Sequence, residues 1–242
     1  MTTVTWLGHS SVVIDMDATR LVTDPVFRRR VAHLTRDAAV PMTDVGQLDA
    51  VLVSHVHRDH LDIPSLMQLG RTLPVMVPLN DGAVLRNRGF DNVVEVSAGD
   101  ELAVGALRID VVPAKHGAVR RTVRARSEAV SFVVRGSHRV YFVGDSDLFP
   151  GMSEVAPVDV ALLPISGWGP RLPAGHLNPR SAAEALALVR PSIAVPVHWG
   201  TYHRIYAAPP GDDVLHAFVR EAADLAPEVD VRVLRPGGTL TL

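Results

Sequence analysis

Three histidines and an aspartate lie within residues 55–60, in the order His-Val-His-Arg-Asp-His. They follow Asp49–Val53, an apolar run that predicts a buried strand. In extended backbone, His55 and His57 would point to the same side and could bind one ion. A turn after the strand would direct Asp59 and His60 toward a second ion. Imidazole and carboxylate groups are ligands typical of zinc, manganese or iron. The alternative is a histidine-rich surface loop, but the preceding buried strand favours a metal site.

The surrounding sequence resembles a known family. Ser54–Asp62 is similar to the first metal motif of the metallo-β-lactamase superfamily. Trp6–Ser11, followed by Thr23–Pro25, resembles one branch of it, which includes N-acylphosphatidylethanolamine phospholipase D and L-ascorbate-6-phosphate lactonase. The resemblance implies an α/β fold, a four-layer αβ/βα sandwich of two mixed sheets with helices outside. It also implies that residues 1–242 form one domain with two metal ions between the sheets.

The same resemblance implies a ligand set that spacing alone could not have paired. Three more residues follow apolar strands and match the superfamily's ligand positions: His116, Asp145 and His198. Alone, each would be an unremarkable histidine or a turn aspartate. The implied first ion is held by His55, His57, His116 and Asp145. The implied second ion is held by Asp59, His60, Asp145 and His198, so that Asp145 bridges the two.

Such a centre implies hydrolysis. Water shared by two dications becomes a hydroxide nucleophile near neutral pH, and the ions polarise the bond under attack. Asp59 and Asp145 are therefore expected to be catalytic as well as ligands. Zinc is the first choice of metal and manganese the second. The expected substrate is a phosphodiester, lactone or other ester, small and anionic.

Alternative functions have different metal requirements. A persulfide dioxygenase-type oxidoreductase would bind a single iron, whereas a processing nuclease would need a basic arm or domain that is not evident here. A metal-binding protein without turnover is a further alternative, which the intact ligand set argues against. Two zinc or manganese ions per chain would support hydrolysis, and one iron would support oxidation.

Further residues are candidates for contacts around the metals. Asp24 is expected to hold a metal-bound histidine in one tautomer. His9 either lines the site or is a hydrogen-bonded core histidine. His176, which precedes Asn-Pro in a loop rich in glycine and proline, is a candidate substrate contact and proton donor. Trp168 and Arg171 are weaker candidates for the pocket wall.

Two arginine-rich segments are each either a solvated surface or a rim that attracts an anionic substrate. Phe27–Gly46 contains Arg28–Arg30 and Arg36. Ala118–Glu128 contains Arg120 and Arg121, which come shortly after His116. Guanidinium groups bind phosphate through paired hydrogen bonds, so Arg120 and Arg121 are the first candidates for substrate binding.

The candidate residues are positioned by alternating strands and helices, which suit mixed sheets. Val4–Met16 predicts one strand kinked at Gly8-His9. Val231–Leu242 predicts a closing hairpin around residues 236–238. Between them, the patterns predict strands at Leu21–Thr23, Asp49–Val53, Val75–Pro78, Val93–Ser97, Glu101–Val104, Leu107–Val112, Ala129–Arg135, Arg139–Val143, Asp159–Ile165 and Ile193–Val197. Helices are predicted at Ile63–Leu69, Asp81–Arg88, Pro179–Val189 and Asp212–Leu225.

Composition limits the class of protein. Hydrophobic residues make up 47% of the chain, enough for a large core. The formal net charge is −2, so no overall basic field would recruit nucleic acid. The chain has no cysteine, which excludes disulfides and cysteine ligands. With no apolar run of membrane-spanning length, we expect a cytoplasmic protein with a small-molecule substrate. A homo-oligomer is left open.

Overall fold

The computed structural model describes residues 1–242 except 38, 41–44, 118, 123–124, 168–171 and 210; it also leaves out the side chains of residues 119–122 and 125–127. Two seven-stranded sheets make up most of it. The first sheet, in spatial order, contains β19 (Gly238–Thr241), β1 (Thr3–Gly8), β2 (Ser11–Met16), β3 (Thr19–Thr23), β6 (Ala50–Leu52), β7 (Val75–Pro78) and β8 (Val93–Val96). The second contains β18 (Asp230–Val231), β16 (Ile193–Val197), β15 (Val160–Pro164), β14 (Arg139–Phe142), β13 (Val130–Arg135), β10 (Leu107–Pro113) and β9 (Glu101–Val104).

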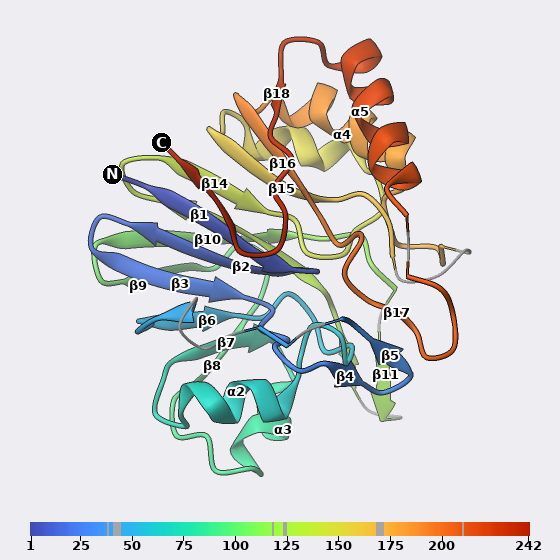
Figure 1. The fold of residues 1–242 in the computed structure, drawn as a ribbon. Coiled ribbons are helices and arrows are strands. Elements are labelled where there is room, and N and C mark those ends of the chain that lie inside the picture. Colours follow the sequence, from blue (N-terminus) through green and yellow to red (C-terminus); the bar gives the residue numbers. More distant parts are fainter. Residues whose placement is uncertain (38, 41–44, 118, 123–124, 168–171, 210) are drawn as a thin grey trace.

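The helices cover the outer faces of the sheets, which gives the expected four-layer αβ/βα sandwich (Figure 1). Helices α2 (Ile63–Leu69) and α3 (Gly82–Arg86) pack on the first sheet. Helices α4 (Pro179–Val189) and α5 (Asp213–Leu225), with the 3-10 helix η1 (Pro150–Val155), pack on the second. No helix among the described residues is both long and apolar enough to cross a membrane.

Strand alternation explains why consecutive residues are apolar in the buried parts of the central strands. In β2, Val12 and Ile14 belong to the core that extends between the sheets, whereas Val13 belongs to the core under α2 and α3. In β6, Leu52 faces the first of these cores and Val51 the second. Successive side chains of a strand point to opposite faces, so a strand covered on both sides needs apolar residues at every position.

Helix termini follow their local sequence. Asp62 caps α2, since its side chain accepts a hydrogen bond from the backbone N–H of Ser65. Asn178 caps α4 and accepts from the N–H groups of Arg180 and Ser181. In both helices a proline lies in the first turn, where its missing N–H costs no hydrogen bond.

Two predictions about strands are wrong. Residues 4–16 form an antiparallel pair, β1 and β2, because the backbone reverses where Gly8 and His9 both have positive φ. The C-terminal residues form no hairpin. Instead, β18 pairs in parallel with β16 and β19 pairs antiparallel with β1, which places the two termini side by side (Figure 1). The turn residues at 236–238 predict a local reversal of the chain, but they carry no information about the distant strands with which β18 and β19 pair.

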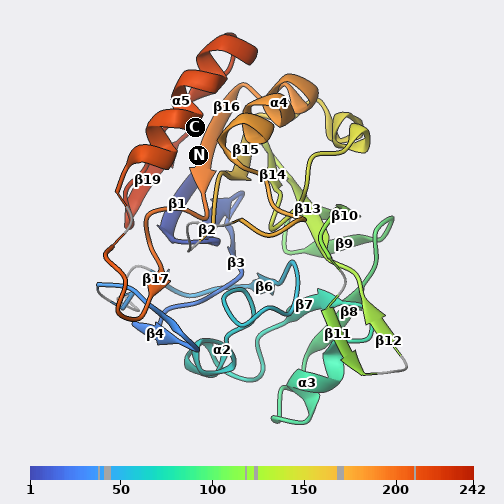
Figure 2. The same cartoon turned by 90° about the vertical axis from the view of Figure 1, so that its right-hand side faces the viewer.

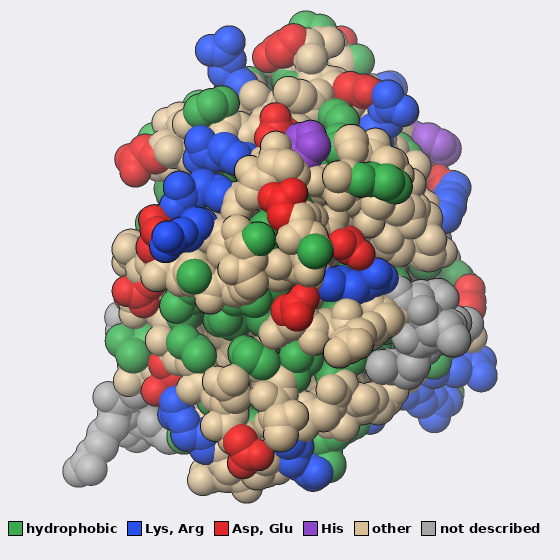
Figure 3. All heavy atoms as spheres, turned by 90° about the vertical axis from the view of Figure 1, so that its left-hand side faces the viewer, with side chains coloured by type: hydrophobic (Ala, Val, Ile, Leu, Met, Phe, Trp, Pro, Cys, Tyr) green, Lys and Arg blue, Asp and Glu red, His purple; other side chains and the backbone are tan. Residues whose placement is uncertain are grey.

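Smaller elements extend from the sandwich. Arg30–Val31 (β4) and Leu34–Thr35 (β5) form a small sheet with His203–Arg204 (β17). Val119–Thr122 (β11) and Ala125–Ser127 (β12) pair with each other, beyond the end of β13 (Figure 2). Neither pairing was predicted, because both segments are short and rich in arginine. On the face drawn in Figure 3, basic and acidic side chains are interspersed, so this face has no continuous basic surface.

Candidate metal centre

The candidate ligands gather where strands of both sheets end. β6 leads into the segment of His55–His60, β10 into His116, β14 into Asp145 and β16 into His198. Two groups of four residues have ligand-type atoms within 4.8 Å of one another. One group is His55, His57, His116 and Asp145, and the other is His9, Asp59, His60 and His198. The first group is the set that the family resemblance implies; the second contains Asp59, His60 and His198 of the implied set, with His9 in place of Asp145.

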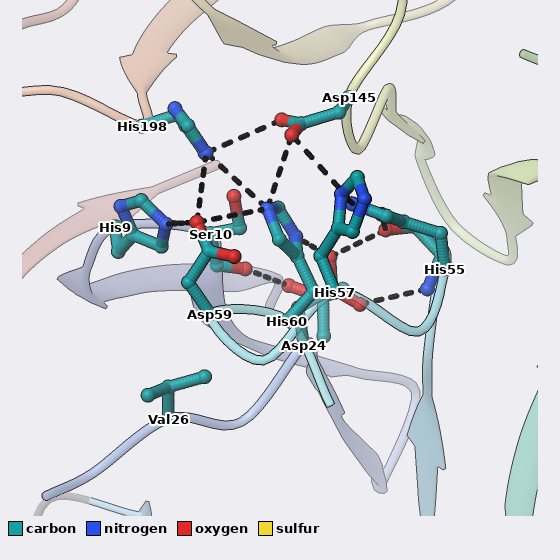
Figure 4. Close-up of polar contacts among 12 residues, drawn as sticks. His9, Ser10, Asp24, Val26, His55, His57, Asp59, His60, Asp145 and His198 are labelled. Carbon is teal, nitrogen blue, oxygen red and sulfur yellow. Dashed lines mark hydrogen bonds and ion pairs between the residues drawn. The ribbon is translucent and has the colours of Figure 1, made fainter. Parts of the chain in front are cut away.

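Asp145 lies between the two groups (Figure 4). Its Oδ2 atom is 3.7 Å from Nε2 of His55, in one group, and 3.2 Å from Nε2 of His60, in the other. Its Oδ1 atom is 3.3 Å from Nε2 of His198. The carboxylate of Asp145, a member of the first group, therefore also contacts histidines of the second.

Hydrogen bonds fix the tautomers of most of these imidazoles. Nδ1–H of His116 donates to the carbonyl of Gly175 at 2.7 Å, and Nδ1–H of His198 donates to that of Ser166 at 2.7 Å. With Nδ1 protonated, the Nε2 lone pair of each ring is directed inward. Such outer partners are typical of metal-bound histidines.

Asp24 is linked by hydrogen bonds to one histidine of each group. It accepts hydrogen bonds from Nδ1–H of His60 at 2.7 Å and from the Ser54 hydroxyl at 2.6 Å. Because that hydroxyl donates to Asp24, its oxygen accepts from Nδ1–H of His55 at 3.0 Å. Asp24 therefore orients one histidine directly and another through Ser54. Asp24 also forms a group with His55 and His60, but these hydrogen bonds suit a positioning role. Sequence analysis missed Ser54, whose only signal was its place before His55.

The donor set fits cations. Nε2 of His55 lies 2.9 Å from Nδ1 of His57, and Nε2 of His60 lies 3.2 Å from Nε2 of His198. Two inward lone pairs repel unless a proton or a cation lies between them. In the described structure, Oδ1 of Asp145 is buried without a hydrogen-bond donor. Divalent ions would satisfy these atoms together.

Burial keeps most of the imidazoles neutral, as ligands must be. Desolvation lowers the pKa of His57 to about 4 and that of His55 well below its usual range. His60 differs: burial opposes its protonation, but the carboxylates of Asp145 and Asp24 raise its pKa well above the usual value. The pKa of Asp145 is well below its usual range because, despite burial, His198 and His60 stabilise the anion.

Backbone strain is concentrated here. His9, Asp24 and His198 all have positive φ, at 55°, 34° and 60°. Such a conformation costs on the order of 1–3 kcal/mol per residue outside glycine. Hydrogen bonds hold it: His198 N–H donates to the His9 carbonyl at 2.9 Å, which also accepts from Trp6 Nε1 at 2.8 Å. Gly144 has φ 63°, and a Cβ atom there would lie 2.6 Å from Cβ of Ser54. Glycine is therefore needed for the turn to Asp145.

His9 and His176 both face the cluster. Nε2 of His9 is 3.1 Å from Oδ2 of Asp59, and its ring lies over that of His198 at 3.9 Å between centroids. The ring is buried and hydrogen-bonded beside the cluster, which fits both interpretations offered above. Nε2 of His176 is 3.2 Å from Oδ2 of Asp145. Burial opposes protonation of His176, but the hydrogen bond and charge of Asp145 outweigh it and raise its pKa.

A cavity of about 580 Å³ opens over the cluster. Val31 and Leu34, from β4 and β5, line one wall, and Leu172 and Pro173 line another. Arg58 lines it as well. Sequence analysis missed the apolar wall, because Phe27–Gly46 has no clear hydrophobic period.

The arginines differ from one another in their surroundings. Arg36 is buried, not solvated: Nη2 donates to the Leu7 carbonyl at 2.9 Å and its guanidinium lies 5.5 Å from the ring centroid of Tyr202. Trp168 and Arg171 lie outside the described residues, as do the side chains of Arg120 and Arg121.

We expect Asp24→Asn to weaken metal binding by about 10- to 100-fold, the usual cost of losing a partner behind a ligand. Its amide nitrogen cannot accept the hydrogen bonds that orient His60 and Ser54. Competition with a coloured chelator measures the affinity, with Asp91→Asn on the exposed surface as the control. Unchanged affinity in a folded Asp24→Asn protein would contradict this role.

Comparisons with known proteins agree with the fold. The domain family described as "Beta-lactamase superfamily domain" matches residues 19–199. A UPF0173 metal-dependent hydrolase from Methanopyrus kandleri is 33% identical over 243 residues, which covers 97% of each chain. An N-acyl-phosphatidylethanolamine-hydrolyzing phospholipase D from Caenorhabditis elegans is 30% identical over 226 residues, covering 82% of this chain and 64% of the relative. The solved structure of Igni18, a metallo hydrolase from Ignicoccus hospitalis, matches 99% of this chain and 97% of its own, with a TM-score of 0.76 and 22% identity.

Proposed function

The chain belongs to the beta-lactamase superfamily domain family, and from this premise we propose that it is a hydrolase with two metal ions that cleaves a small anionic phosphodiester, lactone or other ester. The observation that carries the proposal is the position of Asp145, within 3.7 Å of His55 on one side and 3.3 Å of His198 on the other. A carboxylate in that place can be shared by the two ions of a dinuclear centre.

The proposed ligands come from the two clusters, with Asp145 of the first cluster shared by both ions and His9 of the second left out. His55, His57, His116 and Asp145 would hold one ion, and Asp59, His60, His198 and Asp145 the other. Zinc or manganese, when bound, would activate water and polarise the bond under attack. His9 would orient Asp59 through their 3.1 Å hydrogen bond.

His176 is the proposed proton donor to the leaving group. It lines the cavity, and its proton is stabilised by Asp145. A general acid must hold its proton at the working pH and reach the leaving atom, and an imidazole at the cavity wall can meet both conditions.

The substrate class rests on two kinds of support. The phospholipase D relative acts, by its name, on a phosphodiester, and the metal-dependent hydrolase relative has no substrate in its name. The cavity of about 580 Å³ suits a small molecule. The sequence predicts a cytoplasmic location and no nucleic-acid partner, and both remain predictions. Whether the chain forms a homo-oligomer remains open.

Elemental analysis together with a substrate panel tests the proposal. We expect about two equivalents of zinc or manganese per chain and hydrolysis of at least one of a phosphodiester, a lactone or a simple ester. One iron per chain with oxygen consumption on a persulfide would instead identify the oxidoreductase alternative. Protein that stays free of metal after loading with zinc or manganese would exclude the proposed hydrolase.

A further inference from the structure

A second pocket, of about 290 Å³, lies beside the cavity over the cluster. We call it the side pocket. The two share Val31, Ala32 and Arg58 in their walls. The rest of the side pocket comes from residues around α2 and α3 and from Arg28, close to where β4 lies beside α2 in Figure 2. The two spaces therefore adjoin each other at the three shared residues.

The side pocket has an excess of positive charge. Among its described lining residues, Arg28, Arg58 and Arg88 are basic and only Asp62 is acidic. Arg28 is already paired: its Nε and Nη2 atoms donate to the two Asp62 oxygens at 2.8 and 2.5 Å. Asp62 also accepts from the hydroxyl of Ser65 at 2.6 Å. The charge of Arg28 is therefore neutralised by Asp62. Of the two interpretations of its segment, a rim that attracts an anionic substrate does not fit this residue.

Arg58 and Arg88 have no such compensation. Neither guanidinium forms an ion pair with the described part of the chain, and among the described residues that of Arg88 donates only to the carbonyl of Val84, at 2.9 Å. Both side chains are exposed, so they can adjust to a ligand. Each guanidinium offers paired hydrogen bonds to a tetrahedral or planar oxyanion.

We propose that the side pocket binds a phosphate monoester group carried by the substrate, with Arg58 and Arg88 as its two guanidinium partners. The inference rests on the proposed function, because it places the bond to be cleaved at the metal centre and the phosphate at the other end of the same molecule. A phosphate monoester carries close to two negative charges, which two uncompensated guanidinium groups match. Arg58 stands between the two spaces and holds the substrate at their junction.

Binding of phenyl phosphate, measured by calorimetry, tests the site without turnover. We expect saturable binding by the protein as isolated, and binding that persists after chelation of its metals. Arg58→Ala and Arg88→Ala should each weaken it about tenfold or more, since each loses charge-assisted hydrogen bonds. Arg220→Ala removes an exposed arginine on α5, away from both pockets, and should bind as the wild type does. The affinity should fall as salt rises, because the groups are exposed.

Turnover gives the second measurement. Nitrophenyl esters of phosphooxybutyric acid and hydroxybutyric acid differ only in the phosphate. The ratio of their kcat/KM values should favour the phosphorylated ester, and it should fall about tenfold or more in Arg58→Ala and in Arg88→Ala but not in Arg220→Ala. Equal losses on both esters would mean that these arginines support the fold, and would overturn the proposal.

The outcomes separate this site from the proposed function. Binding that disappears on chelation and is unchanged in both variants would assign phosphate to the metals and overturn the side-pocket site. If phenyl phosphate binding weakens in Arg120→Ala or Arg121→Ala but not in Arg58→Ala or Arg88→Ala, the phosphate binds at Ala118–Glu128. That result would also overturn the side-pocket site. Hydrolysis of the neutral ester in either case would leave the proposed function intact. Binding that only the side-pocket variants lose, without any hydrolysis, would support the phosphate site and contradict the proposed function alone.

Discussion

Replacing Asp145 with asparagine is expected to lower kcat/KM by more than about 100-fold and to weaken metal binding at both positions. Loss of a partner behind a ligand already costs 10- to 100-fold, and Asp145 is proposed to contact the metals directly. An amide is neutral and cannot balance two dications. In the structure the carboxylate also contacts His60 and His176 at 3.2 Å each, so the substitution removes charge from the centre of the cluster.

Asp147→Asn is the matched control for this substitution. Asp147 lies two residues further along the same loop, where its carboxylate accepts from the Leu148 N–H at 2.9 Å and lies 3.9 Å from Lys115. It lines no part of the cavity over the cluster. Elemental analysis and substrate turnover should separate the two variants. Wild-type metal content and activity in Asp145→Asn would exclude Asp145 as the bridge.

Removing the metals should abolish activity and lower the melting temperature by on the order of 10 °C. An ion present at a thousand times its Kd stabilises the folded protein by about 4 kcal/mol. For a chain of this size, each kcal/mol changes Tm by about 2–4 °C. Calorimetry before and after chelation measures the change, and zinc or manganese should restore both the Tm and the activity. Unchanged Tm and activity after complete chelation would contradict a metal-dependent function.

The size of that Tm change should depend on pH. Without metal, Asp145 and Asp24 keep His60 protonated to a pH well above the usual imidazole range. Metal binding at His60 must displace this proton, so affinity rises with pH until the pKa of His60 is passed. We therefore expect a smaller stabilisation by metal at pH 6 than at pH 8. The opposite trend would mean that His60 is not a ligand.

The sequence by itself determined the local features. An apolar run followed by histidines predicted a strand leading into residues 55–60, and the strand β6 ends at Leu52. Proline in the first turn predicted the starts of α2 and α4, because the missing N–H and fixed φ of proline are local properties that suit a helix start. Ligand chemistry was also readable, since imidazole and carboxylate are the groups that bind such metals wherever they are placed.

Tertiary structure decided which distant residues meet. His60 and His198 are 138 positions apart, yet their Nε2 atoms lie 3.2 Å from each other because β6 and β16 end at the same side of the two sheets. Sequence spacing carries no information about that distance, and the pairing of ligands came from family resemblance alone. The same is true of β19, which pairs with β1 because the first sheet has an open edge there.

Charge pairing was the other property that only the fold decided. Arg28, Arg36 and Arg58 look alike in the sequence, but the structure gives each a different environment. Arg28 is neutralised by Asp62, Arg36 is buried against Tyr202, and Arg58 lies between two pockets without an ion pair among the described residues. A guanidinium is available to a substrate only if the protein leaves its charge uncompensated, and that depends on neighbours brought together by folding.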